Sequence, residues 1–335
     1  MENKNFTFFI DYGSYNIKVG SIDKETEKVE NQFEIRALRK TSLAEYNNDK
    51  IIEKLVYEIE KKNKSYLDEI NLMFDDLSLL TVDITNYKTS DTLEVNEELL
   101  MEIVDDAKFQ ISENYPNHEI IHIITKNFIK DEKVIYEPSI NNKAKKFGIN
   151  LIFFLYPNNI LKTIQEGFAK HNVAIKKYIF SSYSKSLFYL NEIKDEEKVI
   201  FVDIGFKKTC SLFFVNKRLE NIKILPIGGN HITQDISKIL KINMENAERL
   251  KLNLNNINSL NDFSNEDVEL IKKIIFSRTE ELLEKSTLFN NSYDNKSNIK
   301  LVFFGNGSKV LDNKFKSKIV FDRKIEFLEE NYSEI

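Results

Sequence analysis

Two stretches of this chain follow one plan, in which an apolar strand ends in Asp-x-Gly and a second apolar strand comes directly after the turn. The first is FTFFIDYGSYNIKVGS, residues 6–21, with Asp11 near the end of its first strand. The second is VIFVDIGFKKTCSLFFV, residues 199–215, with Asp203 in the same place. Each pattern predicts a β-hairpin whose turn presents backbone N–H groups beside a carboxylate. One such turn is common hairpin chemistry, but two related copies predict two structurally similar halves that face one site.

Length and composition exclude several classes of protein. The 335 residues exceed one typical core, so we expect two domains or one domain with insertions. The 48 basic and 53 acidic residues give a net charge of −5, which provides no global electrostatic case for a nucleic-acid partner. The one cysteine, Cys210, excludes an internal disulfide framework and a cysteine-based zinc cluster, and it fits a reducing cytoplasm.

No targeting or membrane-spanning pattern is present in the sequence. The first residues enter a strand without a basic region, a long apolar run or a cleavage site. No run approaches the roughly 18 apolar residues that a membrane-spanning helix needs. We therefore expect a soluble, cytoplasmic chain.

Apolar spacing along the chain predicts alternating helices and strands. Helices are expected at residues 50–66, 94–112, 157–171, 181–190, 230–240, 244–252 and 266–289. Strands, besides the two hairpins, are expected at residues 72–83, 118–125, 128–136, 150–156, 175–180, 222–227 and 301–304. The block that runs strand, helix, strand, strand, strand and ends at Tyr156 carries no dense cluster of chemical groups, so we expect an inserted α+β module. Polar stretches at 253–265 and 290–298 predict loops.

Nucleotide binding is indicated by a series of features rather than by a common signature, since neither GxxxxGK[ST] nor GxGxxG occurs. Hairpin-turn amides can bind phosphate oxygens, and glycines permit close approach of the backbone. Asp11 and Asp203 would hold Mg²⁺ through water, because that ion keeps most of its hydration shell. The series consists, in chain order, of two Asp-x-Gly turns, a Gly228-Gly229 step before a helix, a Glu248/Lys251 pair and a Gly305-Asn306-Gly307 turn after a strand.

Taken in this order, these residues resemble the actin-like ATPase superfamily, and within it the FtsA family of bacterial cell-division proteins. Residues 225–251, LPIGGNHITQDISKILKINMENAERLK, are similar to that family's Gly-Gly-Asn-x-(Ile/Val)-Thr-x-Asp-Ile…Ala-Glu-x-(Leu/Ile)-Lys stretch. IIFSRTEELLE, residues 274–284, adds to the likeness. So does the inserted module, which lies at the position where the family has its SHS2-like subdomain. The resemblance covers nearly the whole chain. It implies a two-lobed actin-like (RNase H-like duplicated) α/β fold with an inserted α+β SHS2-like subdomain.

The resemblance also implies domain boundaries. The first actin-like lobe would comprise residues 1–78 and 157–195, with the SHS2-like subdomain at 79–156. The second lobe would comprise residues 196–230, continue at 299–335 and there return to the first lobe. Residues 231–298 would form a small, partner-binding subdomain of the second lobe.

Carried over residue by residue, the resemblance implies a site for ATP and Mg²⁺. Gly13, Ser14, Tyr15, Asn16 and Lys18 would line the first phosphate loop, with Lys18 reaching the phosphates; Gly205, Lys207 and Thr209 would form the second. Gly228, Gly229 and Asn230 would approach the sugar and phosphates, Glu248 and Lys251 the ribose and adenine, and Gly305, Asn306 and Ser308 the adenosine. Outside this motif, Glu248 and Lys251 would be interpreted as an exposed ion pair within a helix, worth about 0.3 to 0.5 kcal/mol. Within it, we favour the nucleotide role.

The chain departs from the family pattern at two places. Phe206 and Lys207 stand where the second loop usually has glycines, so we expect the chain to hold ATP and to be at most a slow ATPase; no catalytic residue is assigned. Lys207 and Lys208 can compensate as point charges near phosphate. The sequence stops just inside the family's last subdomain helix, before its amphipathic membrane-targeting helix. Either the chain was shortened or this member has no anchor of its own.

The resemblance implies a scaffold that polymerises with itself at the division site, peripheral on the inner, cytoplasmic face of the bacterial cell membrane. It would recruit FtsZ through the FtsZ C-terminal tail, and it would reach the membrane through a tail not present in this chain. No nucleic acid is expected. The partner site is expected on the long helix, near Lys273, Arg278 and Lys285. The alternative for Arg278 is a cap or an ion pair within its own helix.

Two other functions stay open. A PilM-like pilus-assembly ATPase would bind a peptide of an inner-membrane protein, and PilM shares the SHS2-like insertion. A small-molecule kinase would need an acidic base that faces an acceptor pocket, and the sequence offers no candidate beyond Asp11 and Asp203.

The remaining chemical groups are expected to be structural. The four histidines have no metal-ligand spacing. His122 lies in an apolar strand and is expected to be a hydrogen-bonded core histidine, while His231 packs within the Gly-Gly-Asn motif. Cys210 is expected to be a small buried residue. The pairs Asp75/Asp76 and Asp105/Asp106 are expected to be solvated.

Overall fold

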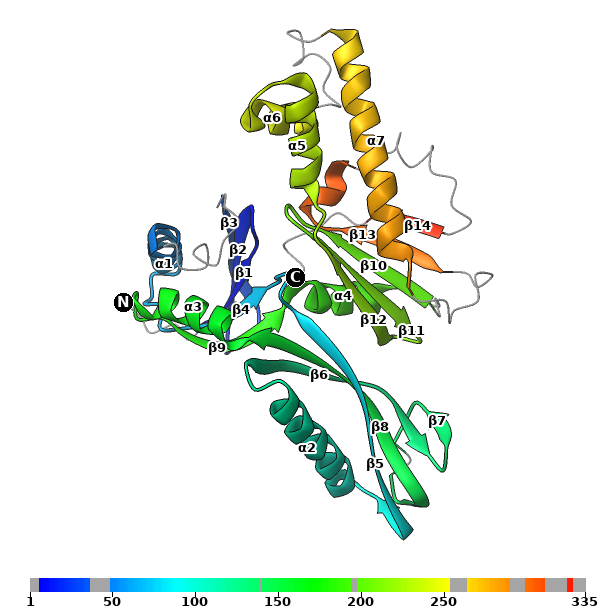
Figure 1. Ribbon diagram of the computed structural model, residues 1–335. Coiled ribbons are helices and arrows are strands. Elements are labelled where there is room, and N and C mark those ends of the chain that lie inside the picture. Colours follow the sequence, from blue (N-terminus) through cyan, green and yellow to red (C-terminus); the bar gives the residue numbers. More distant parts are fainter. Residues whose placement is uncertain are drawn as a thin grey trace. The chain divides into compact units, whose positions relative to one another are not determined.

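The computed structural model describes residues 6–36, 49–138, 140–193, 198–253, 264–289, 299–310 and 324–327. The chain forms two compact units, Met1–Ser184 and Lys185–Ile335. The boundary between them falls within helix α4 (Ser181–Glu192). Each unit is described by itself below, and its elements can be followed in Figure 1. The domain boundaries expected from the sequence are finer than this division and stay predictions.

The first unit is built on a five-stranded sheet with the order β3-β2-β1-β4-β9. The first three strands form an antiparallel meander, β4 pairs parallel with β1, and β9 pairs parallel with β4. The strands are β1 (Phe6–Tyr12), β2 (Asn16–Asp23), β3 (Val29–Arg36), β4 (Glu69–Phe74) and β9 (Ala174–Phe180).

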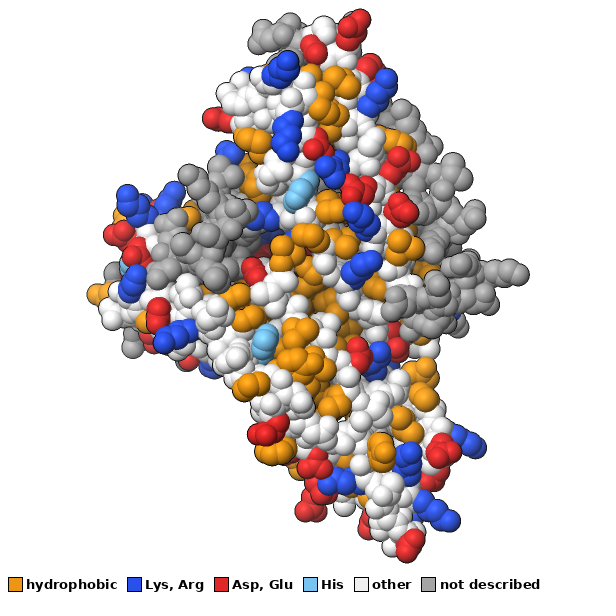
Figure 2. Space-filling model, in the orientation of Figure 1, with side chains coloured by type: hydrophobic (Ala, Val, Ile, Leu, Met, Phe, Trp, Pro, Cys, Tyr) orange, Lys and Arg blue, Asp and Glu red, His pale blue; other side chains and the backbone are white. Residues whose placement is uncertain are grey.

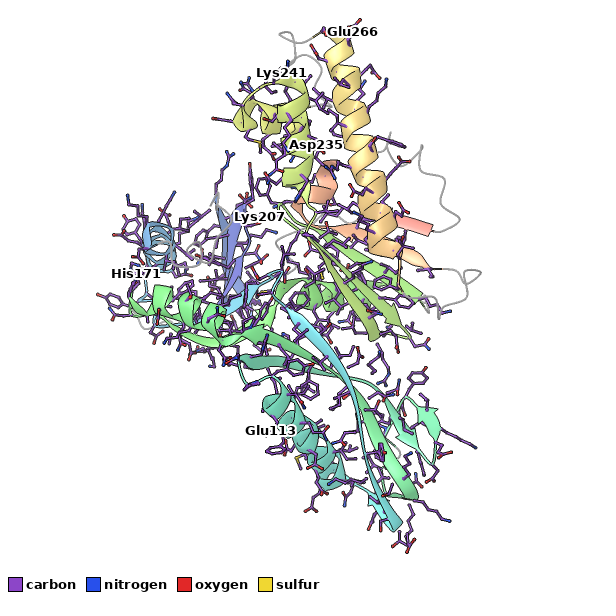
Figure 3. All side chains as sticks on the ribbon, in the orientation of Figure 1. Glu113, His171, Lys207, Asp235, Lys241 and Glu266 are labelled. Atoms are coloured by element: carbon purple, nitrogen blue, oxygen red, sulfur yellow. The ribbon has the colours of Figure 1, made fainter. Side chains whose placement is uncertain are left out.

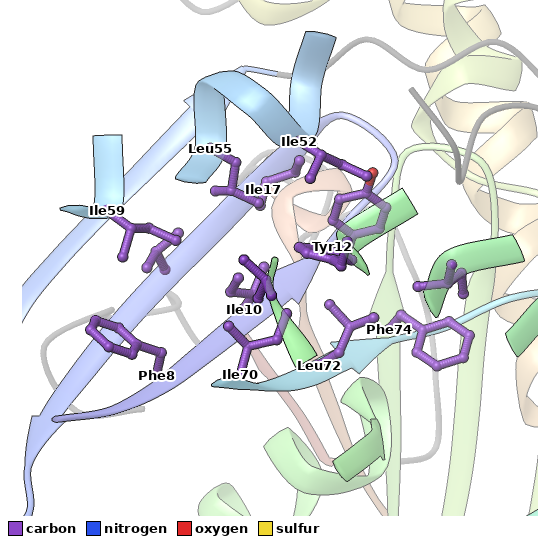
Figure 4. Packing of buried hydrophobic residues seen from close by; sticks show 14 of the residues in the cluster. Phe8, Ile10, Tyr12, Ile17, Ile52, Leu55, Ile59, Ile70, Leu72 and Phe74 are labelled. Atoms are coloured by element: carbon purple, nitrogen blue, oxygen red, sulfur yellow. The ribbon is translucent and has the colours of Figure 1, made fainter. Parts of the chain in front are cut away.

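Alternate side chains of β1 point into the core, because successive residues of a strand face opposite sides of the sheet. Helices α1 (Asp49–Asn63) and α3 (Asn158–Ala169) contribute to the same core. Ile52, Leu55 and Ile59 of α1 follow helical spacing and are fully buried, as Figure 4 shows for their packing with Ile10 and Ile17. Fully burying side chains of this size contributes about 1.5 to 3 kcal/mol each.

The inserted module is a second, four-stranded sheet of the first unit, with the order β5-β8-β6-β7. Helix α2 (Glu97–Asn114) covers one face through Leu99, Ile103 and Ala107, and it begins at Asn96, whose side chain accepts from the backbone N–H of Leu99. The strands are β5 (Leu80–Val95), β6 (His118–Lys130), β7 (Lys133–Ile135) and β8 (Asn142–Pro157). The expected order of strand, helix and three strands is confirmed.

The strand predictions in this unit were wrong in their ends at two places. The strand expected at residues 72–83 is interrupted, because Asp76 makes a turn in which its Oδ1 accepts from both the N–H and the hydroxyl of Ser78. No break lies between the strands expected at 118–125 and 128–136, because β6 continues to Lys130 with an irregular register between Thr125 and Asn127. The break falls instead at the turn of residues 131–132, which separates β6 from β7. Each of the seven predicted helices is present, with ends shifted by a few residues.

The second unit repeats the plan of the first sheet, with the order β12-β11-β10-β13-β14. A three-strand antiparallel meander is again followed by two parallel strands. The strands are β10 (Lys198–Ile204), β11 (Thr209–Val215), β12 (Arg218–Leu225), β13 (Lys300–Phe304) and β14 (Lys324–Phe327). The prediction of two similar halves is thus confirmed; that they face one site stays a prediction.

Three helices complete the second unit: α5 (Gly229–Leu240), α6 (Met244–Asn253) and α7 (Asn265–Thr287). They form a core of their own around Ile236, Leu250 and Ile275, while the C-terminal part of α7 packs on the sheet through Leu282 and Leu283. Acidic and basic side chains are interspersed over the face of these helices drawn in Figure 2. Residues 254–263 and 290–298, where loops were predicted, lie outside the described residues. Within the described part of the chain, no helix has the length and apolar character needed to cross a membrane.

His122 is a hydrogen-bonded histidine of β6, as the sequence predicted. Its Nε2 accepts from the backbone N–H of Phe180 at 3.0 Å, and its ring contacts Phe154 and Tyr183 edge-on or tilted. Accepting at Nε2 requires the neutral imidazole, and burial lowers the pKa of His122 below its ordinary value of 6.5.

Acidification is therefore expected to destabilise the first unit through His122. Because the pKa of His122 is lower in the folded than in the unfolded chain, the contribution of this histidine to the free energy of unfolding is fully present above pH 6.5. That contribution is lost as the pH falls through the folded pKa, by up to about 1.4 kcal/mol per pH unit. We expect the melting temperature to fall more between pH 7 and pH 5 in the wild type than in His122→Gln, which keeps an acceptor but does not titrate. Thermal unfolding followed by circular dichroism tests this, with His118→Gln on the same strand as control. Parallel pH profiles for wild type and His122→Gln would contradict it.

Candidate functional site

The strand register places the two motif aspartates at corresponding positions of the two sheets. Asp11 pairs with Met73 of the parallel strand β4, and Asp203 pairs with Phe304 of the parallel strand β13. Each aspartate thus lies near the carboxyl end of a strand with a parallel neighbour, where loops from both strands meet. In open α/β sheets, ligands bind at such ends.

The first loop is a tight turn whose side chains contact the neighbouring strand. The N–H of Gly13 donates to the carbonyl of Asp11 at 3.0 Å, and a Cβ at Gly13 would lie 2.5 Å from the carbonyl oxygen of Asn16. Asn16 donates to Glu34 at 3.1 Å, and the Tyr15 ring faces the Arg36 guanidinium at 5.1 Å. Ser14 is half-buried, and Lys18 lies opposite Asp11 in the β1–β2 register.

The N-terminus of α4 binds two carboxylates of the first unit. Ser181 donates its hydroxyl to Asp11 at 3.0 Å. Ser182 donates its hydroxyl to Asp75 at 2.6 Å and its backbone N–H to the same carboxylate at 3.1 Å. Negative charge is favourable at a helix N-terminus. The expectation that Asp75 is only solvated was wrong, because its carboxylate accepts both hydrogen bonds from Ser182.

The second loop, residues 205–208, lies directly on the N-terminus of α5. The N–H of Gly229 donates to the carbonyl of Gly205 at 3.0 Å, and the N–H of Asn230 donates to the carbonyl of Phe206 at 2.7 Å. A Cβ at Gly228 would lie 2.6 Å from both of these carbonyl oxygens. Glycine is required at position 228 by this close backbone approach.

The other predicted members of the second loop lie in different surroundings. Thr209 is fully buried and donates its hydroxyl to the carbonyl of Ile227 at 2.7 Å. Lys207, labelled in Figure 3, is half-buried in the loop. His231 accepts at Nδ1 from the N–H of Gly228 at 3.1 Å, so it serves to begin α5.

The turn after β13 packs against the same strand end. Gly305 has a φ of 87°, and a Cβ there would lie 2.3 Å from Oδ1 of Asp203. A Cβ at Gly307 would lie 2.7 Å from the carbonyl oxygen of Ile204. Ser308 is buried and donates both its N–H and its hydroxyl to the carbonyl of Gly305, while Asn306 is half-buried. Three glycine-containing turns of the second unit therefore converge at the carboxyl end of β10.

Glu248 and Lys251 form a buried cluster behind the first turn of α5. Lys251 is 5% exposed, and its ammonium donates to Glu248 at 2.7 Å, to Thr233 at 2.9 Å and to the carbonyl of Gly229 at 3.0 Å. Thr233 also donates to Glu248. Burial lowers the pKa of Lys251, and the neighbouring Glu248 opposes that shift. An exposed intrahelical pair, the alternative considered from the sequence, is thus excluded.

Arg278 of α7 joins two helices. Its guanidinium donates to both oxygens of Asp235 on α5, labelled in Figure 3, and to Glu281 at 2.6 Å. The hydrogen bonds to these carboxylates raise the pKa of Arg278, while bonds from Lys285 and then Arg278 lower the pKa of Glu281. Lys285 is exposed and donates to Glu281 at 2.6 Å, and Lys273 is exposed. Arg278 thus pairs within its own helix and also with α5.

The structure brings the predicted residues together in two sets. In the first unit, Asp11 and residues 13–18 surround the β1–β2 turn. In the second, Asp203, the three glycine turns and the Glu248/Lys251 pair surround the end of β10. Among the described residues, no group of three or more His, Cys, Asp or Glu side chains is arranged to hold a metal ion directly. A metal held through water by a single aspartate, as predicted, would not form such a group.

Solved structures with the same arrangement define the class. The chain matches a structure of the PilM-PilN type IV pilus biogenesis complex over 97% of its own length and 88% of that chain, with a TM-score of 0.65 at 11% identity. It matches the ethanolamine utilization protein EutJ from Carboxydothermus hydrogenoformans over 96% and 84%, with a TM-score of 0.52 at 12% identity. Together with the duplicated sheet, these likenesses confirm the predicted fold, that of the actin-like ATPases.

Sequence comparison narrows the class. Residues 200–290 match the family model FtsA, Cell division protein FtsA. The cell division protein FtsA of Streptococcus pneumoniae serotype 2 is 29% identical over 169 residues, 49% of this chain and 36% of that protein. That of Borreliella burgdorferi is 25% identical over 171 residues, 49% of this chain and 39% of that protein. The chain thus has the actin-like fold and is similar in sequence to FtsA proteins, as predicted, and the matches span little more than a third of the length of these relatives.

Gly305 offers a direct test of the convergence at β10. We expect Gly305→Ala to destabilise the second unit by about 2 kcal/mol or more, because alanine is strained in the left-handed region and its Cβ would overlap Asp203. The matched control is Gly20→Ala on β2, where no atom lies within 4 Å of the added Cβ. Alanine there should be neutral or stabilising by up to about 1 kcal/mol. Urea unfolding followed by circular dichroism measures both, and equal stabilities of the two variants would contradict this arrangement.

Proposed function

We propose that this chain is a nucleotide-binding, actin-like scaffold of bacterial cell division. The single observation that carries the proposal is the match of residues 200–290 to the FtsA family model. That segment contains the second loop, the glycine step that begins α5, the Glu248/Lys251 cluster and Arg278. The sequence likeness is therefore concentrated where the geometry is most constrained.

The proposed ligand is ATP, bound at the glycine-lined end of β10. The proposal rests on the close approach of three backbone segments at this strand end, since a Cβ at position 228, 305 or 307 would overlap atoms of residues 203–208. The amides of Gly205, Gly229 and Asn230 would meet the phosphates, while Asn306 and Ser308 would lie toward the adenosine. Glu248 and Lys251 would bind the ribose and adenine, and Lys207 would supply positive charge.

In the first unit, a phosphate-binding role is proposed for the loop residues Gly13, Ser14, Tyr15, Asn16 and Lys18. Mg²⁺, when bound, supplies charge neutralisation of the phosphates. Asp11 is proposed to hold that ion through water, and Ser181, which donates to Asp11, orients the carboxylate. Asp203 is the second aspartate proposed from the sequence for this role.

The hydrogen bonds of the second loop support the proposal that ATP hydrolysis by this chain is slow. The carbonyls of Gly205 and Phe206 already accept from the amides of Gly229 and Asn230, so a phosphate would compete with the loop for these two donors. Phe206 fills a position where the family has glycine, and Lys251 lies 5.9 Å from its ring centroid. We therefore propose that the chain holds nucleotide more effectively than it hydrolyses it.

The proposed partners are those of the family: a second copy of the chain in a filament, the inner face of the cell membrane, and the C-terminal tail of FtsZ. Arg278, with Lys273 and Lys285, is proposed as the site for that tail. These three cations lie on one helix, where they would favour acidic residues of a partner, because opposite charges across an interface attract.

A pilus-assembly role of the PilM type is the second candidate. The likeness to the PilM-PilN complex over 97% of this chain favours it, because that likeness includes the four-stranded inserted sheet. Binding of a pilus inner-membrane peptide and of the FtsZ tail, measured side by side on the same preparation, separates the two.

Nucleotide binding is expected in the wild type and is expected to be lost on crowding the second loop. Gly228→Ala should weaken the affinity for a fluorescent ATP analogue by about tenfold or more, because its Cβ would push the loop away from α5. Fluorescence anisotropy measures the affinity, with Gly20→Ala as control. No binding by the wild type would overturn the proposed nucleotide site.

Charge reversal tests the partner site. We expect Arg278→Glu to weaken binding of an FtsZ-tail peptide by about tenfold or more. Because this change also breaks the pair with Asp235, its matched control is the exchange Arg278→Asp with Asp235→Arg, which keeps an ion pair between α5 and α7. Titration calorimetry measures affinity and a thermal melt measures folding. Unchanged peptide affinity in a folded Arg278→Glu variant would refute the assignment.

A further inference from the structure

Lys185 is a buried cation with no role in the site as proposed so far. It lies on α4, and its Nζ is 3.9 Å from Oδ2 of Asp203. Both residues are 7% exposed, so little water screens the pair. Burying a lone carboxylate or a lone ammonium is strongly unfavourable, and each group therefore stabilises the other.

The surroundings of Asp203 suit a protein cation better than a hydrated divalent ion. Oδ1 of Asp203 abuts the Gly305 backbone closely enough that a Cβ there would lie 2.3 Å away, and Oδ2 faces Lys185. Mg²⁺ held through water needs a near-octahedral shell of oxygens. The Lys185 ammonium would repel that ion from a short distance in a poorly screened environment. Mg²⁺ at Asp203, as predicted from the sequence, therefore fits these residues poorly.

We propose that Lys185 is the built-in counter-cation of Asp203, and that nucleotide binding by this chain depends only weakly on Mg²⁺. The proposal rests on the nucleotide-binding function proposed above. Lys207 and Lys208 lie in the second loop, which follows this strand, and add two positive charges to that segment. Lysine binds phosphate as a compact point charge and can neutralise it without a divalent ion.

The test compares nucleotide affinity in excess Mg²⁺ and in excess EDTA, using a fluorescent ATP analogue and anisotropy. Wild type is expected to lose less than about threefold in EDTA, and Lys185→Met, which keeps the length of the side chain but removes its charge, about tenfold or more. Lys185→Arg should behave as wild type. Lys238→Met, on an exposed lysine of α5, is the control for a lost positive charge. A wild type that loses tenfold in EDTA, or a Lys185→Met variant with the wild-type response, would overturn the proposal.

A second measurement keeps the proposal separate from nucleotide binding. With no nucleotide present, Mg²⁺ should raise the melting temperature of Lys185→Met, because the positive charge of Lys185 no longer faces Asp203, but should not shift that of wild type or Lys238→Met. Asp203→Asn in the Lys185→Met background should abolish the response. Equal Mg²⁺ responses in all variants would refute the role of Lys185. Failure of the proposed function would instead be seen as no nucleotide binding by any variant in either condition. If Lys185→Met does not fold, the wild-type and Lys185→Arg affinities in EDTA still decide the outcome.

Discussion

Parallel pairing beside each hairpin is the constraint on which the candidate site depends. β1 pairs with β4 and β10 pairs with β13, so the carboxyl ends of two strands meet at each aspartate. The loops that follow must then share a small space, and only backbone without side chains fits. The result is visible at β10, where Gly305 and Gly307 approach the last residues of the strand, and Gly228 the loop that follows it, within distances that exclude a Cβ. The hairpins alone, without their parallel neighbours, would leave the aspartates at an ordinary turn.

The second constraint is that charged side chains buried in the second unit need partners of opposite charge, and the chain supplies these partners as ion pairs. Lys185 with Asp203 and Lys251 with Glu248 are ion pairs with little exposure, and Arg278 with Asp235 is partly exposed. Such pairs are costly to form in low dielectric but more costly to break, because removal of one partner leaves a buried charge. They therefore fix the geometry of α4, α6 and α7 relative to their neighbours within the second unit more than they add stability.

Periodicity predicted the helices and the duplicated sheets because the apolar positions of Ile52, Leu55 and Ile59, or of β1, repeat at the helix or strand period. Motif order predicted that Gly228 and Lys251 belong to one site. Spacing alone could not predict the turn at Asp76, which depends on a side-chain hydrogen bond to Ser78. Nor could it predict the pairs of Ser182 with Asp75 and Lys185 with Asp203, because residues this far apart in sequence meet only through tertiary packing.

The contacts of α5 connect the proposed nucleotide site with the proposed partner site. Its first amides, on Gly229 and Asn230, are bonded to the second loop, and a phosphate that takes either amide must release a carbonyl of that loop. One and a half turns later the same helix carries Asp235, which holds Arg278 of α7. A nucleotide that shifts α5 would therefore change the ion pair of Asp235 with Arg278, and an acidic peptide bound at Arg278 would have to contact the same ion pair. Because both ligands compete for bonds within one rigid helix, their affinities would be coupled, and the coupling would be reciprocal.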